Sequence, residues 1–244
     1  MAMPATFGAA AKKAVTGVAI FVRATTVAFP GIVHEWQQIV VFVSIASMAL
    51  GAFAAIGQTN IKRLMAYSSI GHMGFALVGL AAGTVEGAQS VIVYMAIYVV
   101  MTLGTFAAIL SMRRDDKAVE TISDLAGLAR TDSTMAFFLA TMMFSLAGVP
   151  PLAGFFAKFY VFAAAIKADL YGLSVIGVLS SCIGAYYYLR IVKLMYFDEP
   201  AKAFDRPGVV ARSVLAISAL LIIVFVFAPS PLTNAAMAAA QSLF

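Results

Sequence analysis

The chain has 244 residues, of which 63% are hydrophobic and only 11% are charged, and its mean hydropathy is +0.97. A soluble domain usually carries about 25% charged residues, so the composition excludes one and indicates an integral membrane protein. The apolar runs are long and continuous rather than alternating, which favours an all-α membrane fold over a transmembrane β-barrel.

Seven apolar segments follow one another, and most approach the roughly 20 residues that a helix needs to cross a bilayer. They cover residues 6–28, 37–57, 68–83, 87–112, 134–168, 170–196 and 209–229. The third is short for a crossing. We therefore expect about seven transmembrane helices in one domain of residues 1–230, followed by a short C-terminal tail, residues 231–244, that cannot span again.

The first segment contains two adjacent lysines, Lys12 and Lys13. Lys13 lies about 10 Å along the expected helix, well below the membrane surface. Adjacent helical residues point about 100° apart, so only one of the two needs to face other helices. The position is equally consistent with an interior lysine and with one whose ammonium reaches back to the interface.

The third segment contains His72, in a run with Ser68 and Ser69. Histidine titrates near physiological pH, so His72 is a candidate proton relay. A histidine that packs between helices and hydrogen bonds to a hydroxyl group fits the pattern equally well.

The fifth segment is interrupted by four residues that break helices, Gly148, Pro150, Pro151 and Gly154, and Lys158 follows them. The interruption predicts a single crossing made of two half-helices. Broken helices at membrane depth usually line a cavity enclosed by protein. An ionisable residue at that depth costs roughly 2.5–3.5 kcal/mol and usually marks a path for ions or protons. We therefore favour a functional Lys158 over a lysine that reaches back to the interface.

The sixth segment ends with Tyr186, Tyr187, Tyr188 and Arg190. Aromatic and basic residues often anchor a helix at the membrane surface, so we expect these residues to lie at the interface.

Loop charges indicate the topology. If the fifth segment crosses once, eleven basic residues lie on one side of the membrane and only Arg23 and Lys167 lie on the other. The positive-inside rule then predicts a cytoplasmic N-terminus and an external C-terminus. The net charge of +5 is thus a topology signal and requires no nucleic-acid partner. All carboxylates lie in loops or at helix ends, which leaves the intramembrane lysines without an acidic partner within the predicted spans.

Motifs for redox or metal chemistry are absent from the sequence. A single cysteine, Cys182, and two separated histidines, His34 and His72, cannot supply an iron–sulfur, haem or zinc ligand set. There is no Gly-x-Gly-x-x-Gly or Walker motif. We expect no metal, no bound cofactor and no redox or catalytic centre in this chain.

Three runs of residues resemble one family of membrane proteins. They are QTNIKRLMAYSSIGHMG (58–74), SLAGVPPLAGFFAKFY (145–160) and AYYYLRIVKLMYF (185–197). Together they resemble the antiporter-like subunits of respiratory complex I. The second and third runs are most similar to the subunit N family of NADH:quinone oxidoreductase, rather than to subunits L and M or to the cation/proton antiporter subunits. The resemblance covers about residues 5–230 and corresponds to the C-terminal half of that family only.

The resemblance implies a proton-translocating membrane subunit with one half of an antiporter-like inverted-repeat fold. Lys158 matches the lysine on the second broken helix, and Lys13 matches a lysine on the preceding central axis. Lys12 and His72 are candidate relays. The interruption at residues 148–154 is the expected hinge of the broken helix.

The resemblance also implies a bacterial inner-membrane location within a proton-pumping enzyme. NADH, FMN, iron–sulfur clusters and quinone are then expected in partner subunits. The expected partners are other complex I membrane subunits, the missing N-terminal half of the fold, and membrane lipids.

Two other functions remain open from the residues alone. One is a sodium- or metabolite-coupled secondary transporter in which Lys158 compensates charge. The other is a non-transporting structural module whose lysines bind lipid headgroups.

Overall fold

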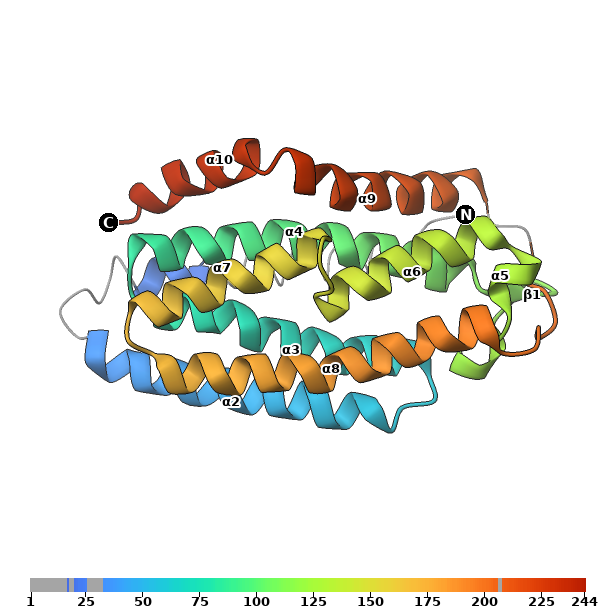
Figure 1. Ribbon diagram of the computed structural model, residues 1–244, viewed down its shortest axis with the longest axis horizontal. Helices are drawn as coiled ribbons and strands as arrows, with labels where there is room; N and C mark the ends of the chain where they lie inside the picture. Colours follow the sequence, from blue (N-terminus) through green and yellow to red (C-terminus); the bar gives the residue numbers. More distant parts are fainter. Residues whose placement is uncertain (1–16, 18–19, 26–32, 206–207) are drawn as a thin grey trace.

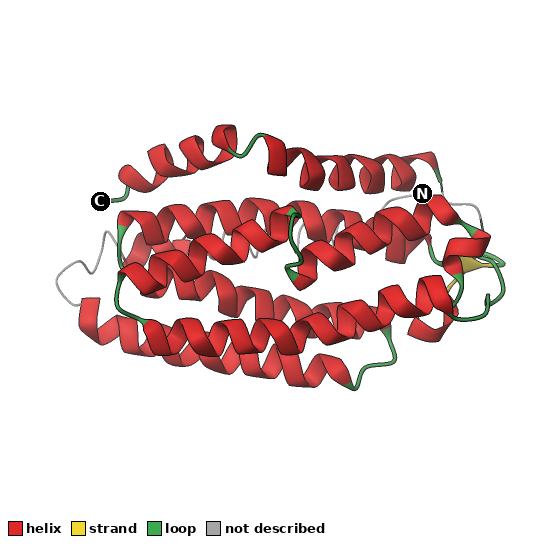
Figure 2. Ribbon diagram, in the orientation of Figure 1, coloured by secondary structure: helices red, strands yellow, loops and turns green. Residues whose placement is uncertain are grey.

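The helices of this protein run along one common axis and pack side by side, as the computed structural model shows (Figure 1). The structure describes residue 17 and residues 20–25, 33–205 and 208–244. The long helices are α2 (Val33–Ile56), α3 (Ile61–Ala81), α4 (Val85–Ser111), α6 (Ser133–Ala147), α7 (Ala153–Lys167), α8 (Tyr171–Phe197), α9 (Val209–Phe227) and α10 (Ser230–Gln241). Between α4 and α6 lie β1 (Arg113–Arg114), β2 (Lys117–Ala118), η3 (Ile122–Leu125) and α5 (Leu128–Thr131). In the described residues, strand is confined to this small hairpin (Figure 2).

The prediction of an all-helical membrane fold with one broken crossing is confirmed. Five described helices, α2, α3, α4, α8 and α9, are long and apolar enough to cross a membrane. The helices α6 and α7 have 15 residues each, and such a helix reaches only about 22 Å, less than the ~30 Å of a hydrocarbon core. Together they run the length of the bundle (Figure 1). Of the predicted segment 6–28, only residue 17 and residues 20–25 are described, and these are helical.

The third predicted segment is longer than its hydropathy indicates. The helix α3 begins at Ile61 rather than near residue 68, and it has 21 residues. The side-chain oxygen of Asn60 accepts a hydrogen bond from the Arg63 N–H (3.1 Å) and so caps the helix. Lys62 donates to the Glu120 carboxylate at 2.6 Å. Hydrogen bonds from Lys62 and Asn60 hold the pKa of Glu120 below its usual value.

The buried centre of the bundle is formed by α3 and α4. Two thirds of each of these spans (67%) is buried, whereas only 33% of α2, 39% of α8 and 28% of α9 is buried, as expected for helices with a face toward lipid. The helices α2 and α3 approach closely because a Cβ at Gly51 would overlap the backbone of Gly71. The Ser44 hydroxyl reinforces this contact by donating to the Gly74 carbonyl at 2.8 Å.

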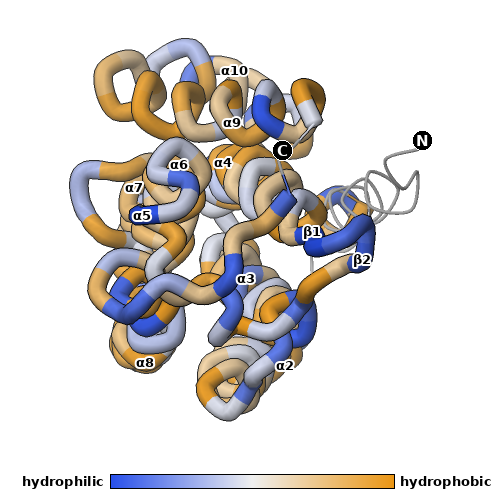
Figure 3. The backbone as a smooth tube through the Cα atoms, turned by 90° about the vertical axis from the view of Figure 1, so that its right-hand side faces the viewer, coloured by the Kyte–Doolittle hydropathy of each residue, from blue (hydrophilic) through white to orange (hydrophobic). Residues whose placement is uncertain are grey.

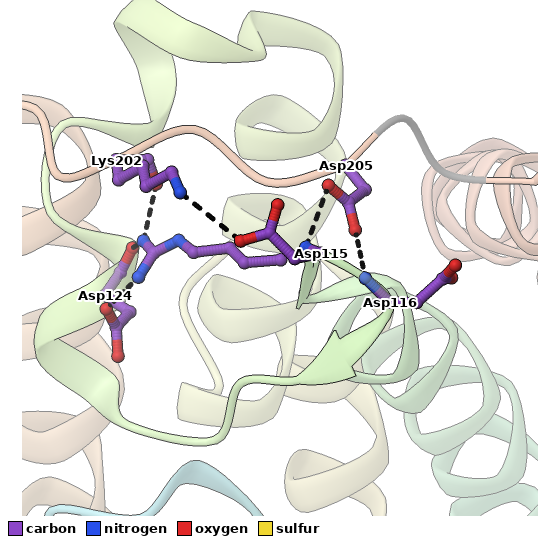
Figure 4. Close-up of polar contacts among 6 residues, drawn as sticks. Asp115, Asp116, Asp124, Lys202 and Asp205 are labelled. Atoms are coloured by element: carbon purple, nitrogen blue, oxygen red, sulfur yellow. Dashed lines mark hydrogen bonds and ion pairs between the residues drawn. The ribbon is translucent and has the colours of Figure 1, made fainter.

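One end of the bundle carries the charged loops, and we call it the hairpin end because it includes β1 and β2. Figure 3 views the molecule from this end and shows that hydrophilic residues are frequent around the hairpin and α5. The Asp205 carboxylate accepts hydrogen bonds from the backbone N–H groups of Asp115 (3.4 Å) and Asp116 (3.1 Å), and Lys202 pairs with Asp115 at 3.5 Å (Figure 4). These contacts attach the connection between α8 and α9 to the hairpin.

The predicted C-terminal tail lies largely in α10. This helix follows α9 and packs beside α4 (Figure 1). Its Ala236 and Ala240 are buried, and the Gln89 side chain of α4 donates to the Thr233 carbonyl at 3.0 Å. At 12 residues it is too short to span the membrane by itself.

Candidate functional site

The break between α6 and α7 begins with a left-handed glycine. Gly148 has φ of +86°, a conformation that favours glycine, and it ends α6. The N–H groups of Gly148 and Val149 both donate to the Phe144 carbonyl, and Gly148 also donates to Ser145. Pro150 and Pro151 follow, joined by a cis peptide bond, and neither can donate to a helix. The chain therefore leaves the helix until α7 starts at Ala153.

A second glycine allows the two half-helices to overlap. A Cβ at Gly154 would collide with the Ser145 carbonyl oxygen, so no other residue fits there without separating α6 from α7. The Gly154 N–H donates to the Ser145 hydroxyl at 3.1 Å, which satisfies one of the free N–H groups at the start of α7. The four predicted helix-breaking residues thus form one compact interruption.

Lys158 points back from α7 into this interruption. Its ammonium donates to the carbonyls of Leu146 (3.0 Å) and Ala147 (2.9 Å) and to the Ser181 hydroxyl of α8 (2.9 Å). A lysine ammonium has three N–H donors, so all of them are used. The last four carbonyls of α6 also all have partners, two from the backbone and two from Lys158.

The charge of Lys158 is balanced by dipoles. Lys158 is 7% exposed, and among the described residues no carboxylate pairs with it. The C-terminal end of a helix carries a partial negative charge, which favours a cation at this position. The ring of Phe75 adds a cation–π contact, with its centroid 5.0 Å from Nζ.

His72 lies near Lys158 and is held by tyrosines from two other helices. Its Nδ1 lies 2.7 Å from the Tyr94 hydroxyl and its Nε2 lies 3.2 Å from the Tyr188 hydroxyl. The Tyr188 hydroxyl also hydrogen bonds to Ser68. The Tyr98 ring stacks on His72 at 5.0 Å between centroids, while its hydroxyl donates to Ser69.

A small cavity joins the two ionisable residues. It has a volume of about 10 Å³ and is lined by Lys158, His72, Ser68, Ser181, Tyr187 and Tyr188, among others. This is roughly the space that one water molecule requires, and the polar lining offers it partners. The side chains of Lys158 and His72 therefore lie beside the same small cavity.

The structure brings together some of the predicted site residues. Lys158 and His72 share one cavity next to the break. The candidate residues Lys12 and Lys13 lie outside the described residues. No group of three His, Cys, Asp or Glu side chains suited to a metal ion occurs in the part of the chain that the structure describes.

Sequence reasoning missed the partners of the site. Tyr186, Tyr187 and Tyr188 were expected at the interface, but of these three only Tyr186 is exposed (55%), whereas Tyr187 and Tyr188 are buried; all three lie inside α8, which continues to Phe197. A signal was present in the sequence, because Ser181, Gly184 and Tyr188 recur at intervals of three and four residues and so share one helical face.

Comparisons with known proteins agree on the kind of protein that this chain resembles. A family model described as NADH:quinone oxidoreductase/Mrp antiporter, TM, matches residues 3–184. The chain is 67% identical to NADH-quinone oxidoreductase subunit N of Beijerinckia indica subsp. indica over 98% of this chain and 50% of that protein. It is 59% identical to NADH-quinone oxidoreductase subunit N 1 of Rhizobium meliloti over 99% of this chain and 50% of that protein. The chain thus spans about half the length of the curated relatives it matches.

Solved structures show the same architecture. A chain of respiratory complex I from Thermus thermophilus with bound NADH is 26% identical, with a TM-score of 0.76 over 91% of this chain and 49% of that chain. A chain of the Mrp complex from Dietzia sp. DQ12-45-1b has a TM-score of 0.83 over 93% of this chain and 50% of that one, at 20% identity, which shows the fold alone.

Proposed function

Because this chain belongs to the NADH:quinone oxidoreductase/Mrp antiporter family of transmembrane proteins, we propose that it forms the Lys158-containing half of a proton-translocating membrane subunit. The subunit would be of the N type and would work inside a bacterial complex I. The observation that carries the proposal is the Lys158 ammonium, buried at the break of a membrane helix and bound by carbonyls rather than by a carboxylate. This environment can accommodate both the charged and the neutral lysine.

Proton exchange at Lys158 follows from its hydrogen bonds. As an ammonium, Lys158 uses all three N–H groups; as an amine it keeps two, for the carbonyls of α6, and its lone pair can accept a hydrogen bond from the Ser181 hydroxyl. Burial disfavours the charge, while the end of α6 and the Phe75 ring favour it. Since these effects oppose each other, a small change in hydration or in nearby charge would release or capture the proton.

The energy for this exchange would come from redox chemistry in other subunits. Subunits of the same complex would hold NADH, FMN, iron–sulfur clusters and quinone, and charge changes in neighbouring membrane subunits would reach Lys158. A separate segment would supply the first half of the fold, with Lys13 on the axis between the halves, Lys12 as a further relay and residues 148–154 as the hinge. The basic residues at the hairpin end support a cytoplasmic position for that end, and hence a periplasmic C-terminus.

Substitution of Lys158 in the assembled complex tests the proposal. In vesicles from the native membrane, Lys158→Met is expected to lower the rate of NADH-driven proton pumping on the order of a hundredfold, the typical loss of rate for a positioned proton-transfer group. Lys158→Arg should lower proton pumping to a similar extent, because a guanidinium keeps the charge but does not release its proton. Pumping is measured with a pH-sensitive dye.

Lys167→Met is the matched control, because Lys167 lies at the exposed far end of the same helix. It should pump normally. Unchanged pumping by Lys158→Met would contradict proton exchange at this residue. Full pumping by Lys158→Arg would mean that a fixed positive charge is sufficient.

A further inference from the structure

Two adjoining cavities lie between α6 and α9 at the hairpin end. The first has a volume of about 400 Å³, and its lining includes the charged residues Asp132, Asp205 and Arg212. The second has a volume of about 180 Å³ and shares Met135 and Arg212 with the first, so the two form one groove. We call it the α6–α9 groove, and neither cavity includes a residue of the cavity beside Lys158.

The α6–α9 groove changes from polar to apolar along its length. Of α9, the first cavity contacts only Arg212, whereas the second reaches Ala216, about one helical turn (~6 Å) further from the hairpin end. Phe138 and Leu215 give the second cavity apolar walls. Further along α9, Ile217 is 57% exposed, which continues the apolar surface toward the side of the bundle. The groove therefore leads from the charged loops to the surface that faces lipid.

The guanidinium of Arg212 is open to an anion. Its side chain is 55% exposed, and among the described residues its ion-pair partner is Asp132, at 3.8 Å. That distance is too long for a hydrogen bond. A guanidinium presents a planar fork of N–H donors, which matches the oxygens of a phosphate group. Arg212 can therefore receive a phosphate at the mouth of the groove.

The two carboxylates of the groove favour a cation beside that phosphate. The Asp132 carboxylate accepts from the Met135 N–H at 3.0 Å, and the Asp205 carboxylate accepts from the N–H groups of Asp115 and Asp116 (Figure 4). These bonds fix both side chains and leave further lone pairs on their oxygens. Of the described lining residues, two are thus anionic and one is cationic, so a headgroup with only negative charge would be repelled.

We propose that the α6–α9 groove binds a phospholipid with a phosphoethanolamine headgroup. The phosphate would lie on Arg212, the primary ammonium would donate to Asp132 and Asp205, and an acyl chain would follow the apolar walls of the second cavity. The depth fits this ligand, because Arg212 lies three residues after the start of α9, about 5 Å along the helix, where headgroups meet a spanning helix. The proposal depends on the membrane location of the chain and not on proton transfer by Lys158.

Photo-crosslinking of the protein, purified from its native membrane with its partners, tests the headgroup preference. The protein is placed in phosphatidylcholine bilayers, because a choline headgroup has no N–H to donate. The bilayers contain a trace of phosphatidylethanolamine with a diazirine on one acyl chain, or of phosphatidylglycerol with the same chain. Peptide mass spectrometry should find the ethanolamine probe on the segments around Phe138 and Leu215 about tenfold more often than the glycerol probe, as the loss of a charged hydrogen bond predicts.

Two variants separate the contributions of the charges. Arg212→Gln should lower labelling by the ethanolamine probe about tenfold, because the phosphate loses its cation. Arg63→Gln is the matched control and should label normally, because Arg63 is also exposed in the first turn of a spanning helix but does not line the groove. Asp132→Asn keeps a residue that caps α6 but removes one negative charge, so the preference for the ethanolamine probe should become smaller.

Equal labelling by the two probes in the unmodified protein would overturn the proposal, because the groove would then not distinguish the headgroups. Absence of label from the α6 and α9 segments would also overturn it and would indicate that a protein partner covers the groove. If Arg212→Gln does not assemble, an undiminished preference in Asp132→Asn would contradict the proposed role of the carboxylates.

Discussion

The Lys158 ammonium is stabilised by neutral dipoles, and this distinguishes it from a structural ion pair. A carboxylate at hydrogen-bond distance would hold the lysine charged and would itself need to be neutralised before the proton could leave. The carbonyls of Leu146 and Ala147 stabilise the ammonium without adding a full negative charge. They are available only because α6 ends beside Lys158.

Gly148→Ala is expected to damage this site in two ways. Its φ of +86° costs a residue with a side chain about 1–2 kcal/mol. Its Cβ would also lie 3.0 Å from Cδ and 3.1 Å from Nζ of Lys158, which would push the ammonium from its carbonyls. Thermal unfolding and proton pumping of the assembled complex should both fall. Gly172→Ala is the control, because nothing lies within 4 Å of the added Cβ; an equal loss in both variants would contradict this explanation.

Single residues in the sequence predicted only part of the site. Lys158 could be detected because a charged residue within an apolar run is costly to place in a membrane. Gly148 and Pro151 could be detected because glycine and proline break helices. The partners of these residues were not detectable, since Ser181, Tyr94 and Tyr188 come from other helices and meet only in the folded bundle. Hydropathy alone cannot distinguish a tyrosine that faces the membrane interface from one that faces a buried histidine.

At the level of elements, hydropathy predicted the order of helices better than their ends. It missed the start of α3, because a cap from Asn60 and an ion pair from Lys62 extend the helix into polar sequence. It found the α6–α7 interruption, because glycines and prolines mark it directly. The overlap of the two half-helices could not be predicted, since it depends on contacts between Gly154 and Ser145 across the break.

Ser145→Ala tests whether that overlap is held by the serine cap. Loss of the hydroxyl leaves the Gly154 N–H without its acceptor, and loss of a helix cap typically costs about 1 kcal/mol. Thermal unfolding of the purified complex should show the decrease. Ser111→Ala is the matched control, because the Ser111 hydroxyl donates only within its own helix, to Ala107 at 2.7 Å. If the two variants unfolded alike, the cap would not stabilise the break.

At the scale of the whole molecule, the described residues form a charged end, apolar sides and a largely apolar interior that contains some buried polar groups. The loops at the hairpin end are joined by ion pairs such as Arg114 with Asp124 and Lys202 with Asp115. The sides expose large apolar residues, as lipid contact requires. Among the buried polar groups, Ser68, Tyr94 and Tyr188 form hydrogen bonds around His72, which lines one cavity with Lys158. Because the chain spans about half the length of its curated relatives, we expect this interior to act together with a second half on another segment.

The most direct test of this account is to recover the natively expressed, tagged chain from its membrane and to identify by mass spectrometry what accompanies it. The account predicts NADH dehydrogenase subunits together with sequence that supplies the first half of the fold, either as a separate polypeptide or joined to this chain in a heavier intact mass. Recovery of the chain alone, at 25.7 kDa, from membranes with active complex I would contradict a role for Lys158 in that enzyme.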